Sequence, residues 1–182
     1  MQSKLILVDF EMNNIDIGLS ITNFPGGEIN VITDPDKIEG LDDEVGYGIK
    51  AWIHDSDGLI ALAQLSAILR SKGMTNLNLI LGYVPYARQD RICNNGESLA
   101  IKVFTNFINS LNFTCVLIFD PHSDVTPALI NSVCTFSKEE ILARPIVIDH
   151  NGVIIDGNHR AVKAKQLGMQ RIPAYYPIKD AE

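Results

Sequence analysis

The sequence predicts an α/β fold in which a largely parallel sheet is flanked by helices. Short apolar runs alternate with longer amphipathic stretches along the chain, and this alternation is typical of strands and helices that follow one another in such folds. The chain has 182 residues, 46% of them hydrophobic, which is enough to bury a core. Its size fits one main domain with a small appendage.

Five apolar runs have the length expected of buried strands, and two longer stretches have leucine, isoleucine and phenylalanine at helical spacing. Thr126 and Pro127 predict a further helix start, and a polar stretch at residues 132–140 follows it. An acidic run at residues 34–44 is typical of a solvated loop rather than a metal site. The expected strands are residues 5–8, 28–32, 49–53, 77–81 and 115–119, and the expected helices are residues 58–71 and 98–111.

The alternation of apolar runs and amphipathic stretches ends at the polar stretch, so we expect one module at residues 1–140 and a second at residues 141–182. In the second module, two short apolar runs flank Asn151 and Gly152, a pair that is a strong signal for a hairpin turn. A helix at residues 158–167 and a strand at residues 172–176 are expected to complete an α+β appendage.

Composition excludes several classes of function. The formal net charge of -7 gives no general attraction for nucleic acid. No apolar run reaches the roughly 18 residues that span a bilayer, and the first thirty residues do not have the pattern of a signal peptide. We therefore expect a cytoplasmic protein that does not bind a membrane. Cys93, Cys115 and Cys134 lack the spacing of a metal site and are predicted to be reduced packing residues.

The first group of candidate site residues follows the strand at residues 77–81. Arg88 and Arg91 carry forked guanidinium groups that can each bind two phosphate oxygens, and Gln89 offers a donor and an acceptor to a base edge. In a parallel sheet these side chains would lie beyond the carboxyl end of the strand, where such sheets bind ligands. An ion-paired surface loop explains the same spacing equally well.

The next strand ends in a similar way, in Asp120 and His122. If the two strands are neighbours, this carboxylate and imidazole lie beside the first loop, where they are candidates to contact a phosphate or its magnesium ion. A histidine at the end of a strand is also a common structural feature.

A second loop, at residues 156–160, turns from a strand through glycine into a helix start. The backbone N–H groups there and Arg160 are expected to converge on one spot that suits a phosphate. Alternatively, Asn158 only caps the helix and Arg160 pairs with Asp156. The candidate phosphate-binding residues of this loop are Gly157, Asn158, His159 and Arg160.

Four segments of residues 1–135 carry a resemblance to a known family: NFPGGE at residues 23–28, YARQDR at 86–91, GESLAIKVF at 96–104 and FDPHSDVTPALI at 119–130. Through them, residues 1–135 resemble ribose-phosphate pyrophosphokinase, also called phosphoribosyl pyrophosphate synthetase, and look most like its bacteriophage members. The resemblance implies a phosphoribosyltransferase-like fold that binds ATP as its magnesium complex, with Arg88, Gln89 and Arg91 at the nucleotide and His122 by the phosphates. Phe24 and Glu28 match a loop that reaches a neighbouring subunit's adenine site, which implies a homo-oligomer.

Residues 143–178 resemble the ParB and sulfiredoxin fold, in which a similar turn binds nucleotide phosphates. The resemblance makes Asp156 a candidate to assist phosphoryl transfer. Sulfiredoxin chemistry is not expected, because its catalytic cysteine has no counterpart in this turn.

Three hypotheses follow. The first is an ATP-dependent phosphotransferase or diphosphotransferase with Arg88, His122 and Asp156 as catalytic candidates and a sugar phosphate or ADP-ribose-like molecule as acceptor. The second is a non-catalytic nucleotide-binding or assembly protein, which is favoured because the sequence has no acidic pair followed by a Thr-Gly-Gly-Thr turn, the family's ribose-phosphate loop. The third, a ParB-like nuclease or DNA-binding regulator, rests on the short second module alone.

Overall fold

The structure is a computed structural model that describes residues 3–9, 11–42, 44–119, 121–136, 146–148, 154–156, 161 and 174–175. The chain divides into two compact units, Met1–Thr135 and Phe136–Glu182. This division falls a few residues before the boundary expected after residue 140. The separate roles expected of the two modules stay predictions.

The first unit is built on a six-stranded sheet with the order β2-β1-β5-β6-β7-β8. The central strands β5, β6 and β7 are parallel to one another, whereas β1 is antiparallel to both β2 and β5. The sheet is therefore mixed at one edge rather than parallel throughout, because no single crossover helix connects β1 to β5. The strands are β1 (Lys4–Val8), β2 (Asn14–Ile15), β5 (Tyr47–Trp52), β6 (Leu77–Leu81), β7 (Val116–Phe119) and β8 (Val133–Phe136).

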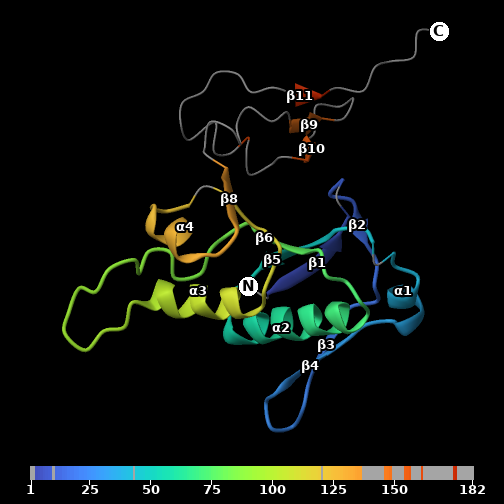
Figure 1. The fold of residues 1–182 in the computed structure, drawn as a ribbon, viewed down its shortest axis with the longest axis horizontal. Helices are drawn as coiled ribbons and strands as arrows, with labels where there is room; N and C mark the ends of the chain where they lie inside the picture. Colours follow the sequence, from blue (N-terminus) through green and yellow to red (C-terminus); the bar gives the residue numbers. More distant parts are fainter. Residues whose placement is uncertain are drawn as a thin grey trace. The chain divides into compact units, whose positions relative to one another are not determined.

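Two long helices cover one face of this sheet (Figure 1). Helix α2 (Ser56–Ser71) connects β5 to β6, and helix α3 (Ala100–Ser110) connects β6 to β7. Both connections advance in the same direction across the sheet, so right-handed crossovers place both helices on the same side. The predicted α/β fold is thus confirmed.

Leucine and isoleucine side chains from strands β1, β5, β6 and β7 and from the two long helices form the core. Each of the largest is almost completely buried, and each falls on the apolar stripe or strand position expected from the sequence pattern. Among them are Leu7, Ile49, Leu62, Leu65, Leu69, Leu77, Leu79, Leu81, Ile101 and Ile108.

Two elements differ from the expectation. The acidic run is not only a solvated loop, since Asp34 caps a short helix, α1 (Pro35–Glu39), whose Ile38 is buried. A capping aspartate followed by proline is a helix-start signal that the charge pattern masked. The stretch expected to be polar begins with strand β8, whose residues are Val-Cys-Thr-Phe, so it is apolar and strand-forming at its start.

The strand expected at residues 28–32 lies outside the main sheet. It forms β4 (Ile29–Ile32), which pairs with β3 (Ser20–Asn23) in a separate antiparallel hairpin. Gln64 on α2 anchors this hairpin, because its amide donates to the carbonyl of Ile29 at 3.0 Å and accepts from the N–H of Val31 at 2.9 Å. The turn of the hairpin projects away from α2 (Figure 1).

The second unit contains a three-stranded sheet with the order β10-β9-β11. Strand β10 (Ile154–Asp156) is antiparallel to β9 (Ile146–Ile148), and β11 (Ala174–Tyr175) is parallel to β9. The hairpin and the last strand agree with the sequence analysis. Its turn at Asn151 and Gly152 and the helix expected at residues 158–167 lie outside the described residues, apart from Ala161.

Helix α4 (Val125–Leu129) begins one residue before the predicted Thr126–Pro127 start. Within the described part of the chain, every helix is too short or too polar to cross a membrane.

Candidate functional site

The candidate site lies beyond the carboxyl ends of the parallel strands β5, β6 and β7. These three ends share one edge of the sheet because the strands run in the same direction, and the carboxyl edge is where open α/β sheets bind ligands. The loop with Arg88 follows β6, and the segment with His122 follows β7. Both sequence-predicted groups of the first unit therefore emerge from adjacent strands.

The loop after β6 has a defined shape. Gln89 donates its backbone N–H to the carbonyl of Tyr86 at 2.8 Å, and the N–H of Ile101 in α3 donates to the carbonyl of Gln89 at 3.4 Å. Tyr86 has a φ of 62°, a left-handed conformation that is costly for a bulky residue. Its ring contacts that of Phe104 in α3 with centroids 6.3 Å apart, so packing against α3 holds the strained turn that presents Arg88.

A hydrogen bond joins the two loops. The hydroxyl of Ser123 donates to the carboxylate of Asp90 at 2.7 Å. This bond is the main reason that the pKa of Asp90 is lowered, and the nearby charges of His122 and Arg91 lower it further. The YARQDR loop and the His122 segment thus form one continuous polar surface.

Arg88 and Arg91 are exposed and have no carboxylate partner among the described residues. The ion pairs in this part of the chain join Lys37 to Asp16 and Lys72 to Glu39 instead. Asp90, the nearest candidate counter-charge, accepts from Ser123. The alternative of an ion-paired surface loop is therefore not observed in the described residues, and both guanidinium groups remain open to an anion.

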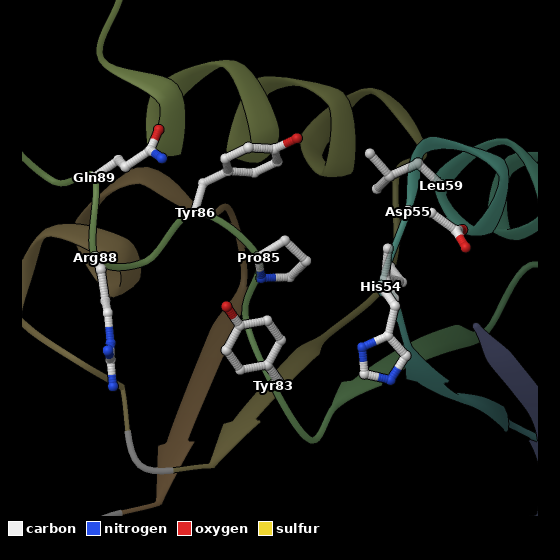
Figure 2. A pocket seen from close by; sticks show the side chains of 9 residues that line it. His54, Asp55, Leu59, Tyr83, Pro85, Tyr86, Arg88 and Gln89 are labelled. Carbon is white, nitrogen blue, oxygen red and sulfur yellow. The ribbon is translucent and has the colours of Figure 1, made fainter. Parts of the chain in front are cut away.

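Arg88 and Gln89 border a first cleft of about 590 Å³. Figure 2 shows Tyr83 between Arg88 and His54. The cleft combines aromatic rings with a cation, an imidazole and a carboxylate, which suits a ligand with a flat ring and polar substituents. It is lined by Ile53, His54, Asp55, Leu59, Tyr83, Pro85, Tyr86, Arg88 and Gln89.

The same two residues also border a second cleft of about 470 Å³, together with Arg91, Cys93, Glu97 and Ser98. Glu97 holds the loop in shape, because its carboxylate accepts from the backbone N–H of Cys93 at 3.1 Å and from the backbone and side chain of Asn94. These bonds, that of the Asn94 side chain first, lower the pKa of Glu97. Arg88 and Gln89 thus line both clefts.

His54, Asp55 and Tyr83 were missed in the sequence analysis. His54 and Asp55 follow β5 directly, so the rule that directs attention to the carboxyl ends of parallel strands would have found them. Asp55 also caps α2 by accepting from the N–H of Gly58 at 2.8 Å, the main cause of its lowered pKa. No sequence pattern marked Tyr83 as a site residue, apart from its place in the loop after β6.

Of the two expected magnesium ligands, His122 and Asp120, the structure describes only His122. Among the described residues, no group of three His, Cys, Asp or Glu side chains could hold a metal ion. His122 is exposed and offers nitrogen, whereas Mg²⁺ prefers oxygen ligands. Asp120 lies outside the described residues, so its role as a ligand stays a prediction. The described side chains therefore do not form a dedicated metal site.

The remaining candidate residues lie away from the two clefts or outside the described residues. Phe24 and Glu28 flank the turn of the β3–β4 hairpin, and neither lines the two clefts. The backbone of Asp156 ends β10. The roles predicted for this aspartate and for residues 157–160, which lie outside the described residues, stay predictions.

The fold is that of a phosphoribosyltransferase-like α/β protein. It is similar to the crystal structure of phosphoribosylpyrophosphate synthetase from Mycobacterium smegmatis, with a TM-score of 0.55 and 18% sequence identity over 88% of this chain and 55% of that chain. At this identity the likeness concerns the fold alone.

In sequence, part of the chain is homologous to ribose-phosphate pyrophosphokinases at low identity. The enzyme of Thermococcus kodakarensis is 28% identical over 108 residues, which are 59% of this chain and 36% of the relative. That of Methanobrevibacter smithii is 23% identical over 148 residues, 76% of this chain and 48% of the relative. The chain thus spans between about a third and a half of the length of these relatives. The likeness to phage members stays a prediction.

A ParB-like protein of Sulfolobus acidocaldarius is 36% identical over 55 residues, 30% of this chain and 28% of that protein. No family model matches the chain.

The Asp90–Ser123 bond can be tested through the ionisation of Asp90. Ser123→Ala removes the largest cause of its lowered pKa, so the midpoint should rise toward the ordinary value of 3.8. Because the pKa is lowered in the fold, the stabilisation of the joined loops is present above that ordinary value and is lost as pH falls through the lowered one. Carboxyl chemical shifts followed by NMR against pH measure it. Ser110→Ala, which removes a hydroxyl bonded within α3, is the control, and an unchanged midpoint in Ser123→Ala would contradict the assignment.

Proposed function

We propose that this chain binds magnesium ATP on the loop at residues 88–91 and is a phosphotransferase or diphosphotransferase resembling ribose-phosphate pyrophosphokinase. The observation that carries the proposal is the Asp90–Ser123 hydrogen bond. It joins the loops of two parallel strands at the ligand-binding edge of the sheet, beside two arginines without an ion-pair partner among the described residues.

The phosphates would bind to the guanidinium groups of Arg88 and Arg91, because planar forks match phosphate oxygens in pairs. Gln89 would hydrogen-bond the base edge, and His122 would lie by the phosphates. Magnesium would enter with the nucleotide on its phosphate oxygens, which suits a site whose described side chains form no metal cage.

The chemistry assigned to these residues is positioning and charge neutralisation. Phosphoryl transfer requires little covalent participation by the protein, and cationic groups stabilise the charge on the transferred group. Arg88 is well placed for this task, since it borders both clefts and would touch ligands bound on either side. The acceptor class that we propose is a sugar phosphate or an ADP-ribose-like molecule.

A second candidate is a non-catalytic nucleotide-binding or assembly protein. Its basis is that Arg88 and Arg91, which have no ion-pair partner among the described residues, could hold the phosphates of a nucleotide without any acceptor. The two candidates share the nucleotide site and differ in whether an acceptor reacts.

Transfer is tested directly with magnesium and ATP labelled at the beta or gamma phosphate, offered with ribose 5-phosphate, ADP-ribose or serine. The enzyme proposal expects label in the acceptor, from both positions for a diphosphoryl transfer and from the gamma position alone for a phosphoryl transfer. Tight ATP binding with no labelled product for any acceptor would leave the binding-protein candidate.

The nucleotide site is tested by calorimetry with magnesium ATP. Arg88→Ala should weaken binding about 10- to 100-fold, since it removes charge-assisted hydrogen bonds to phosphate. Lys102→Ala is the matched control, because Lys102 is an exposed cation on α3 that borders neither cleft. If Arg160→Ala weakens binding and Arg88→Ala does not, the second loop holds the nucleotide and the proposed site is wrong.

We also propose that the chain forms a homo-oligomer in the cytoplasm through the β3–β4 hairpin. Phe24 is 54% exposed at the turn and Ile32 is 46% exposed. The register pairs Ile32 with Ser20, so Ile32 and Phe24 lie on the hairpin face opposite the buried Val31. An apolar surface of this kind on a projecting hairpin is suited to contact with a second copy. Gln64 fixes the hairpin to α2 through both of its amide atoms, which limits the entropy lost on association.

Light scattering after size-exclusion chromatography measures the assembly. Phe24→Ser should shift the population toward smaller species, because it removes the exposed ring at the turn of the hairpin. Val103→Ser serves as control, since Val103 is even more exposed, at 63%, but lies on α3. A monomeric wild-type chain, or equal shifts in both variants, would rule out the hairpin contact.

A further inference from the structure

Two of the three cysteines lie against each other at the edge of the main sheet. Cys115 directly precedes β7, and Cys134 lies within the neighbouring strand β8. Their sulfur atoms are 3.2 Å apart, and the backbone N–H of Val116 donates to the carbonyl of Ser132 at 3.0 Å. The sheet therefore holds the two thiols in contact although 19 positions separate them in the sequence.

We propose that Cys115 and Cys134 are a site of reversible oxidation, at which a hydroperoxide converts the two thiols into an intramolecular disulfide. A disulfide bond measures about 2.05 Å, so the sulfur atoms need to approach by only about 1 Å from their separation of 3.2 Å. The expectation that all three cysteines are packing residues was wrong for Cys93 and Cys134, which are exposed.

The two thiols have different surroundings, which assigns the order of events. Cys134 is exposed, whereas Cys115 is partly buried. Burial first, and then the neighbouring Cys134, raise the pKa of the Cys115 thiol to about 11, so Cys115 stays protonated at neutral pH. Cys134 is the sulfur that a dissolved oxidant reaches, and Cys115 is the resolving partner.

With hydrogen peroxide the steps balance. The Cys134 thiol gives up its proton and its sulfur attacks one peroxide oxygen. The O–O bond breaks, a sulfenic acid forms, and the leaving hydroxide takes up that proton as one water molecule. The sulfur of Cys115 then attacks the sulfenic sulfur, and its proton leaves with the hydroxyl group as a second water molecule. The two thiols lose two electrons in total and the peroxide gains two.

The disulfide would close a loop that includes His122, Ser123 and helix α4, since these lie between the two cysteines in sequence. The bond would lie at the amino end of β7, and Ser123, which donates to Asp90, follows the carboxyl end of that strand within the closed loop. Oxidation therefore constrains the segment on which one side of the candidate site is built, whatever ligand that site takes.

The test is to treat the full chain with a small excess of hydrogen peroxide, denature it in an alkylating reagent, digest it and map the cysteines by mass spectrometry. We expect alkylatable thiols to fall from three to one per chain, with Cys93 remaining free and a reducible peptide linking Cys115 to Cys134. Thiol titration on the intact protein follows the same change.

Two variants make the result specific. Cys134→Ser, at an exposed position, should abolish the linked peptide and leave Cys115 alkylatable, whereas Cys93→Ser should form the link as the wild type does. The proposal is overturned if Cys134 proceeds to the sulfinic acid without forming the link, or if Cys93 is the cysteine consumed.

Discussion

The parallel pairing of β5, β6 and β7 is the constraint on which the candidate site depends. Register along these strands brings three strand ends to one edge of the sheet, so Asp90 and Ser123, 33 positions apart, come into contact there. His54 follows the first of these strands, Arg88 the second and His122 the third. If the order of the strands were different, the same side chains would be scattered over the surface.

The turn from β5 into α2 illustrates how tightly this edge is built. Asp55 accepts from the N–H of Gly58 and from the hydroxyl of Ser3, and the same hydroxyl accepts from the N–H of His54. A β-carbon on Gly58 would collide with the side chain of Ser3, so glycine is required for this close approach. The antiparallel strand β1, which begins next to Ser3, thereby fixes the cleft residues that follow β5. The mixed edge of the sheet thus has a role in supporting the site.

Sequence patterns were sufficient where a single physical signal dominated. The apolar stripes of α2 and α3 and the runs of β6 and β7 predicted the core and hence the position of Arg88 and His122. The patterns failed where tertiary contacts decide the outcome. Nothing in the four-residue run of β8 reveals that it pairs beside β7. Likewise, the contact between Cys115 and Cys134 arises from this pairing, and no local motif encodes it.

The residues that both clefts share bear on the proposed nucleotide binding and on the proposed transfer. Arg88 and Gln89 border both spaces, so an anion held by the guanidinium group would lie at the boundary between two ligands, which is the geometry that a transfer reaction needs. The same boundary also serves a protein that only senses a nucleotide, since one cleft is then enough. The loop is held by the strained turn at Tyr86, its contact with Phe104 and the Asp90–Ser123 bond. These restraints hold the loop in shape while its arginines have no ion-pair partner among the described residues. Both the proposed nucleotide binding and the proposed transfer require arginines that are free to contact phosphate.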